Sequence, residues 1–316
     1  MLWLVVVLVF LISQALAALH PPNCFPAIGF KMPAILPSTT NNWWCDMNTE
    51  YAFIGFSYEV TVCQSFNQLR SEFTDIRQRF KGRYVRIYGA CDRKGFYDDV
   101  MNAAWEAGLG VHALIWFGFD GDDKWKTRRD TLLAALHANP KAKFVTRVVQ
   151  FGSEPLYDNV LSPLKLATQV LAAKENLSSL GIPVTISELA YGYQKRGGAK
   201  DVLDATDLID AHMLPFFSQR ASTASKSWPI VLNDLDWFIG NGEGKKIYLT
   251  ENGWPSVTSE GVMPNSPNAV ADIQNESDYY KLLDSQCSYF KKVPGGGVGW
   301  FAHIYSDAQE PGYWHL

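Results

Sequence analysis

The sequence predicts an α/β fold, a (β/α)8 TIM barrel, because short apolar runs alternate with helical stretches and eight such units fit the chain length. Most of the runs are continuously apolar, as in strands buried on both faces. Strand–helix alternation indicates parallel βαβ units. Eight units need about 250 residues, and the chain has 316. The predicted strands cover residues 52–58, 84–88, 110–116, 144–151, 183–189, 208–214, 246–250 and 297–305.

Amphipathic periodicity places helices between these strands. Gly108, Gly181 and Gly240 each follow an apolar helix, where a left-handed C-cap favours glycine. The chain ends soon after the last predicted strand, so we expect the eighth helix to be missing or truncated. No phosphate-binding glycine motif is present, which disfavours a doubly wound nucleotide-binding sheet. The predicted helices cover residues 65–80, 97–107, 124–138, 163–180, 225–239 and 269–290.

The first 17 residues predict a signal peptide, and residues 18–316 a single mature domain. Residues 2–12 are almost entirely apolar, and Ala-Leu-Ala at 15–17 is a cleavage pattern. The run is short of the ~20 apolar residues of a membrane span, and a signal anchor is the alternative. Secretion makes the cysteines disulfide candidates. An odd number leaves at least one unpaired, and their spacing does not give the connectivity. They are residues 24, 45, 63, 91 and 287.

Composition narrows the class of protein further. There are 28 Lys and Arg against 32 Asp and Glu, a net charge of −4, and this disfavours a nucleic-acid partner. Hydrophobic residues make up 47%, which disfavours disorder. Aromatic residues reach 14%. Sequons at Asn176 and Asn275 fit a secreted glycoprotein. We expect no cofactor and no metal, since no His, Asp and Glu residues show metal-ligand spacing.

Two carboxylates follow apolar strands at positions where barrel enzymes place their chemistry. Glu154 follows the fourth predicted strand and Glu251 the seventh. The C-terminal ends of barrel strands form the active-site face, so these side chains are expected to face each other across the mouth. Glycoside hydrolysis needs such a pair, one carboxylic acid for the leaving oxygen and one carboxylate for the oxocarbenium-like centre. The alternative is two ordinary ion pairs at the rim.

Three motifs together resemble the family 17 glycoside hydrolases, most closely the fungal secreted β-1,3-glucanases and glucanosyltransferases. They are VRIYG at 85–89, GSE at 152–154 and TENGWP at 250–255, and the likeness extends over residues 53–312. The resemblance implies a barrel that retains anomeric configuration, with Glu154 as general acid/base and Glu251 as nucleophile. Retention needs the carboxyl groups about 5–5.5 Å apart.

Further site residues come from the resemblance and from the strand ends. Arg86 is expected to hold Glu251 ionised and oriented. The chain departs from the family at Ser153, where Asn is usual, and in the run 212–217, HMLPFF. His212 is either a donor near Glu251 or a satisfied core histidine. The substrate-binding candidates are Tyr58, Arg86, Tyr88, Trp116, Ser153, Tyr191, His212, Trp254 and Asp307.

Aromatic rings at the strand ends can pack against the C–H faces of sugars, although aromatic residues are also ordinary core material. A third strand carboxylate, Glu188, is expected to be buried and paired with Arg or Lys rather than catalytic.

The sequence therefore predicts a secreted, monomeric, cell-wall-associated enzyme acting on a polysaccharide, β-1,3-glucan, with no membrane contact after signal cleavage. Two alternatives stay open. One is transglycosylation, in which a sugar rather than water attacks the intermediate. The other is a non-catalytic glucan-binding barrel, favoured by Ser153 and by the expected loss of the last helix.

Overall fold

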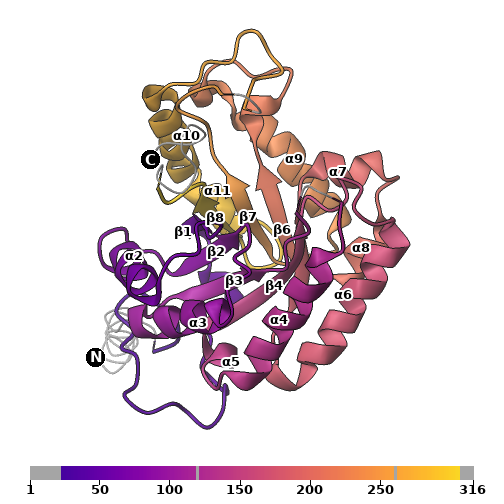
Figure 1. Cartoon of the computed structure of the whole chain (residues 1–316). Helices are drawn as coiled ribbons and strands as arrows, with labels where there is room; N and C mark the ends of the chain where they lie inside the picture. Colours follow the sequence, from indigo (N-terminus) through magenta and orange to yellow (C-terminus); the bar gives the residue numbers. More distant parts are fainter. Residues whose placement is uncertain (1–22, 119–120, 260–261, 307–316) are drawn as a thin grey trace, which may run out of the picture.

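The structure is a computed structural model that describes residues 23–118, 121–259 and 262–306. Within these residues, eight parallel strands pair in sequence order, and the last pairs with the first to close a barrel (Figure 1). The predicted (β/α)8 barrel is confirmed. The predicted signal peptide, the expected loss of the eighth helix and Asp307 all lie outside the described residues.

The strands pack inside a layer of helices that follow them in the chain (Figure 1). The strands are β1 (Ala52–Glu59), β2 (Tyr84–Tyr88), β3 (Gly110–Leu114), β4 (Thr146–Ser153), β5 (Val184–Glu188), β6 (Ile209–Met213), β7 (Ile247–Asn252) and β8 (Val298–Ala302). The α-helices are α2 (Phe66–Gln78), α3 (Phe96–Ala107), α4 (Lys124–Ala138), α5 (Ala142–Val145), α6 (Pro163–Leu177), α7 (Ala190–Lys195), α8 (Lys200–Ala205), α9 (Trp228–Asn241), α10 (Ile273–Ser285) and α11 (Cys287–Lys292). The 3₁₀ turns are η1 (Met47–Thr49), η2 (Ser178–Leu180), η3 (Pro215–Phe217) and η4 (Ala224–Lys226).

The structure differs from the expected elements mainly at their ends. The helix expected over 225–239 begins at Trp228, where Pro229 occupies the first turn, a position that tolerates its missing N–H. The helix expected over 269–290 is two helices, α10 and α11. Gly108 and Gly181 cap helices with left-handed φ angles of 73° and 67°, as predicted. Gly240 does not cap a helix, because α9 continues through it to Asn241.

The barrel interior holds a chain of polar side chains that links non-neighbouring strands. Arg86 of β2 donates from Nε to Gln150 Oε1 of β4 at 2.9 Å. Gln150 donates in turn to Asp210 of β6, which also contacts His112 Nδ1 of β3 at 3.2 Å. All four residues are buried. Contacts between strands that are not sheet neighbours must cross the interior, so these side chains fill the barrel beneath its mouth.

Residues 23–50, which we call the N-terminal cover, close the end of the barrel opposite the mouth. The disulfide Cys24–Cys45 closes a loop within this segment. Trp43 stacks on Phe25 and donates from its indole nitrogen to the carbonyl oxygen of Phe144 at 2.7 Å. Phe144 lies just before β4, so this hydrogen bond attaches the cover to the start of a barrel strand.

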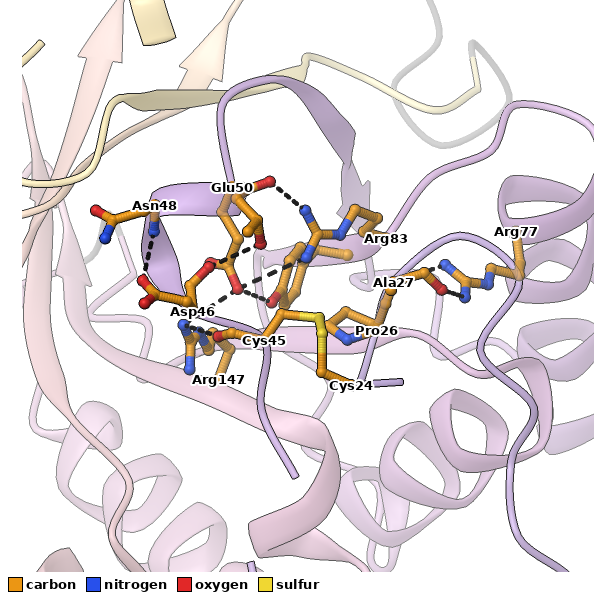
Figure 2. Close-up of a disulfide and its surroundings, with 12 residues drawn as sticks. Cys24, Pro26, Ala27, Cys45, Asp46, Asn48, Glu50, Arg77, Arg83 and Arg147 are labelled. Carbon is orange, nitrogen blue, oxygen red and sulfur yellow. Dashed lines mark hydrogen bonds and ion pairs between the residues drawn. A yellow bond between two sulfur atoms is a disulfide. The ribbon is translucent and has the colours of Figure 1, made fainter. Parts of the chain in front are cut away.

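Glu50, at the end of the cover, is fully buried and lies among cations from strand starts (Figure 2). One of its carboxylate oxygens lies 3.1 Å from Arg147 and 3.9 Å from Arg83. Lys246, just before β7, donates to the carbonyl oxygens of Glu50 and Met47 at 2.6 and 3.0 Å. Burial lowers the pKa of Lys246 to about 7. The cover is therefore bound to the starts of several strands at once.

As their odd number requires, the cysteines do not all form disulfides. A second disulfide, Cys63–Cys91, links the segments that follow β1 and β2. Cys287 has no disulfide partner in the part of the chain that the structure describes. Among the same residues, every helix is too short or too polar to span a bilayer.

Candidate active site

Glu154 lies on a sharp turn at the end of β4. Gly152 has a φ of 106° and Glu154 itself a φ of 54°, a left-handed conformation that is uncommon for non-glycine residues. A Cβ at Gly152 would lie 2.8 Å from the ring of Phe117, so only glycine fits. The backbone N–H of Glu154 donates to Ser187 O at 2.8 Å. The Glu154 side chain remains 24% exposed, which leaves it accessible from the mouth.

Glu251, on β7, is held by two donors on one of its oxygens. Arg86 Nη1 lies 2.7 Å from Glu251 Oε1, and Ser153 Oγ donates to the same oxygen at 2.6 Å. Burial alone would raise the pKa of Glu251, but the charges of His212 and Arg86 outweigh it and bring the pKa to about 2. Glu251 is therefore an oriented carboxylate, and Arg86 makes the contact expected from the sequence.

His212, on β6, lies between the two carboxylates. Its Nδ1 is 2.8 Å from Glu154 Oε1, and its Nε2 is 3.4 Å from Glu251 Oε1 and 2.7 Å from Ser187 Oγ. Burial would lower the pKa of His212, but the negative charges of Glu251 and Glu154 raise it above its ordinary value. Of the two interpretations left open by the sequence, the structure places His212 at the carboxylate pair.

The two carboxylates are close enough to act on one bond. One oxygen of Glu154, one oxygen of Glu251 and a ring nitrogen of His212 all lie within 4.8 Å of one another. Such a cluster has the spacing of a metal site. However, the Arg86 guanidinium already pairs with Glu251 at 2.7 Å, and its positive charge disfavours a cation there. The arrangement favours proton transfer and nucleophilic attack.

Several polar residues of this site escaped the sequence analysis. Ser187 and Thr250 share a 2.7 Å hydrogen bond beneath His212, and Gln150 supports Arg86. Asp158, four residues after Glu154, has a pKa raised to about 6 by burial and by the charges of Glu154 and Glu251. The signal for Gln150 is a polar residue inside an apolar strand run. Ser187 and Thr250 give no comparable signal, since both are common in strands.

Of the aromatic candidates, the structure brings Tyr88 to this cluster. The Arg86 guanidinium carbon lies 5.5 Å from the centre of the Tyr88 ring, and the same ring packs at 5.4 Å against His303. Tyr88 is partly buried at the end of β2.

The structure does not bring Tyr58 or Trp254 to the carboxylates, and the expectation that they contact substrate is corrected. Tyr58 is fully buried and points toward α2, where its hydroxyl donates to Glu72 and its ring packs on Phe73. The reason is strand alternation, since the neighbouring Ser57 faces the interior and donates to Thr250 O. Trp254 is also fully buried and donates to Val270 O at 2.8 Å. Neither ring offers a face to a sugar.

Trp116 and Tyr191 lie beyond the strand ends, as predicted, but each ring lies against another side chain of the protein. Arg128 covers the ring of Trp116 at 5.4 Å. Tyr191 is 55% exposed and lies 6.2 Å from the ring of Tyr157. Substrate contact by either residue remains a prediction.

Glu188 is buried as expected, but its partners are backbone amides rather than Arg or Lys. Its oxygens accept from the N–H groups of Leu156, Tyr157 and Leu189 at 2.7, 3.1 and 2.9 Å. Burial and the charge of Glu154 raise the pKa of Glu188 to about 8.

Comparison with known proteins gives the family. The model of the BtgE/BtgC glycoside hydrolase domain matches residues 54–309. The chain belongs to this family. The matched range contains every described strand except the first two residues of β1, so the glycoside hydrolase domain is the barrel itself. None of the curated proteins matches.

Solved structures share the fold at low identity. A β-1,3-glucanosyltransferase active-site mutant from Rhizomucor miehei, in complex with laminaritriose, is 18% identical over 80% of this chain and 86% of its own, with a TM-score of 0.65. The family 17 β-1,3-glucanosyltransferase from the same organism is 19% identical over 79% of this chain and 86% of its own, with a TM-score of 0.64. An endo-laminarinase from Formosa Hel1_33_131 is 13% identical over 82% and 80%, with a TM-score of 0.61.

Proposed function

We propose that this glycoside hydrolase barrel cleaves β-1,3-glucan with retention of configuration, with Glu154 as acid/base and Glu251 as nucleophile. The observation that carries the proposal is the carboxylate pair, whose oxygens come within 4.8 Å across the mouth. Retaining enzymes hold their carboxyl groups about 5–5.5 Å apart, whereas inverting enzymes need about 6.5–9.5 Å to admit a water.

Each carboxylate has surroundings suited to its proposed role. Glu251 is ionised and held by Arg86 and Ser153, with its other oxygen outside these two hydrogen bonds. That oxygen attacks the anomeric carbon and forms the glycosyl-enzyme. Glu154 gives a proton to the leaving oxygen, then takes one from the incoming water as the covalent bond breaks.

His212 offers a source for the acid proton. The 2.8 Å contact between His212 Nδ1 and Glu154 Oε1 lets the two groups share one proton. When a glycosidic oxygen reaches Glu154, the proton on this pair is transferred to it. The imidazole thereby links the protonation of Glu154 to the charge of Glu251, which lies 3.4 Å from Nε2.

The substrate, the finer family and the cellular location are parts of the same proposal. The similar solved structures include a β-1,3-glucanosyltransferase in complex with laminaritriose and an endo-laminarinase, and the three sequence motifs resemble fungal family 17 enzymes. Two disulfides fit the predicted signal peptide and secretion. Glycosylation at Asn176 and Asn275, association with the cell wall and a monomeric state complete the proposal.

Laminarin hydrolysis by the wild type beside Glu251→Ala tests this function. We expect the variant to lose at least about 10⁴-fold in kcat, because removal of a covalent nucleophile abolishes the first step. Glu243→Ala, at an exposed position in the segment before β7, is the matched control and retains full activity. Equal rates in the wild type and Glu251→Ala would overturn the assignment.

Transglycosylation is the second candidate, favoured by the similarity to two glucanosyltransferase structures. Products longer than a laminari-oligosaccharide substrate would identify it, whereas shorter products alone indicate hydrolysis. Glucan binding without turnover would identify the third possibility, a non-catalytic barrel.

A further inference from the structure

The segment that follows Glu154 is attached to β5 through a buried carboxyl group. Glu188, the last residue of β5, is fully buried. Its Oε2 accepts from the N–H groups of Leu156 and Tyr157, two and three residues after Glu154. These two amides open a turn and have no earlier backbone carbonyl to bond, so a side-chain acceptor satisfies them as an N-cap does.

The same strand also holds Glu154 itself. The carbonyl oxygen of Ser187, the neighbour of Glu188, accepts from the N–H of Glu154 at 2.8 Å. The end of β5 therefore binds the chain at Glu154 and again just after it. Glu154 has a left-handed φ of 54° between these attachments, and such a backbone persists only where its surroundings fix it.

Gly192 shows that α7 is built around this carboxyl group. A Cβ at Gly192 would lie 2.2 Å from Glu188 Oε1 and 2.5 Å from Glu188 Cδ. Gly192 lies inside α7, where alanine would otherwise be the better helix former. The missing side chain leaves the space that the Glu188 carboxyl group occupies.

We propose that Glu188 is a positioning residue for the acid/base Glu154, acting through the turn at residues 155–157. This inference rests on the proposed function for the role of Glu154. The carboxyl group of Glu188 fixes the turn, the turn fixes the backbone of Glu154, and the Glu154 carboxyl group then meets His212 Nδ1 at 2.8 Å. Glu188 itself does not contact the substrate.

Three variants separate this role from a general loss of folding. Glu188→Ala removes every acceptor. Glu188→Gln keeps one oxygen that can accept from both Leu156 and Tyr157, and should retain more activity. Gly192→Ala leaves Glu188 in the sequence but displaces its carboxyl group. Glu175→Gln, on the exposed surface of α6, is the control.

Two glucosides with different leaving groups provide the decisive measurement. The leaving oxygen of laminarin needs a proton, whereas 2,4-dinitrophenolate leaves a 2,4-dinitrophenyl β-laminaribioside without one. We expect Glu188→Ala and Gly192→Ala to lower kcat/KM for laminarin by about a hundredfold, the effect of a displaced catalytic group. The kcat/KM for the dinitrophenyl substrate should be nearly unchanged. An equal loss on both substrates, or no loss on either, would overturn the proposal.

Hydrogen exchange tests the attachment independently of activity. The amides of Leu156 and Tyr157 should exchange faster in Glu188→Ala and Gly192→Ala than in the wild type or Glu175→Gln. Unchanged exchange would refute the anchoring role. A wild type inactive on both glucosides would instead refute the proposed function, and the exchange result would still decide whether Glu188 holds the turn.

Discussion

At the residue scale, the ionised state of the site depends on contacts between buried charged groups. One oxygen of Glu251 accepts hydrogen bonds from Arg86 and Ser153, while His212 contacts both Glu251 and Glu154. A buried carboxylate without such partners would be protonated at neutral pH. The ionised state of Glu251 is therefore a product of its neighbours, and changes to those neighbours should alter how the protein responds to pH.

The stability of the folded protein should fall in acid because of Glu251. Its pKa is about 2 in the folded state, against an ordinary value of 4.5. Since the folded pKa is depressed, the stabilisation is present above pH 4.5 and is lost as the pH falls toward 2, an effect on the order of 3 kcal/mol. Urea unfolding of the wild type and Glu251→Gln at pH 6 and pH 3 measures it. The variant should show the flatter pH dependence, and parallel losses in both proteins would contradict this account.

Ser153 should contribute to catalysis through Glu251. Ser153→Ala removes the 2.6 Å donor to Glu251 Oε1 and an acceptor for Arg86. We expect kcat/KM for laminarin to fall about tenfold to a hundredfold, the cost of one hydrogen bond to a charged group. The acidic limb of the pH profile should move to higher pH, because Glu251 loses a donor. Ser153→Thr keeps the hydroxyl and should resemble the wild type. A wild-type profile in Ser153→Ala would disprove the role.

At the element scale, the sequence predicted the strands better than the short helices or the inward faces. Apolar runs located every strand of the barrel because burial on both faces leaves a strong signal. Helices α7 and α8 have six residues each, too few for a helical period to emerge. The face that Tyr58 presents depends on strand register, which one apolar run does not encode.

For the site as well, the sequence indicated some residues and not others. Glu154, Glu251 and Arg86 stood at strand ends or in recognisable motifs. Glu188 was expected to pair with a cation, but it bonds amides of a turn whose conformation no local pattern revealed. His212 could be placed only once β6 and β7 had a register, since His212 pairs with Glu251 across that strand pair.

Strand β1 should depend on a glycine for its pairing. A Cβ at Gly55 would lie 1.8 Å from the backbone carbonyl oxygen of Tyr84 in β2. Backbone atoms cannot rotate away as a side chain can, so Gly55→Ala should destabilise the protein by about 3 kcal/mol, the upper part of the overpacking range. Thermal unfolding would measure the loss, with Gly240→Ala as a control because nothing lies within 4 Å of a Cβ there. Similar melting temperatures for the two variants would contradict this prediction.

At the scale of the whole molecule, the two ends of the barrel have different tasks. The mouth carries the carboxylates, and the opposite end is closed by the N-terminal cover and its buried Glu50 (Figure 2). The polar chain from Arg86 to His112 fills the space between. The cover should therefore affect stability much more than catalysis.

Cys24→Ser tests this separation. The disulfide spans 21 residues, and a loop of that size contributes about 3 kcal/mol by restricting the unfolded chain. We expect the variant to unfold at lower urea concentration, with kcat for laminarin unchanged at temperatures where it remains folded. Cys287→Ser, at the cysteine without a disulfide partner among the described residues, should match the wild type in both measurements. A fall in kcat without a fall in stability would refute the division of tasks.

The contacts of the cover also constrain the order in which a newly made chain can fold. Glu50 and Met47 are bound by Lys246, which itself also donates to the carbonyl oxygens of Gly296 and Gly297. Lys246 follows Glu50 and Met47 by 196 and 199 residues along the chain, so a ribosome makes it about 200 residues after the cover. The cover must therefore wait, already synthesised, until Lys246 has emerged before it can make these contacts.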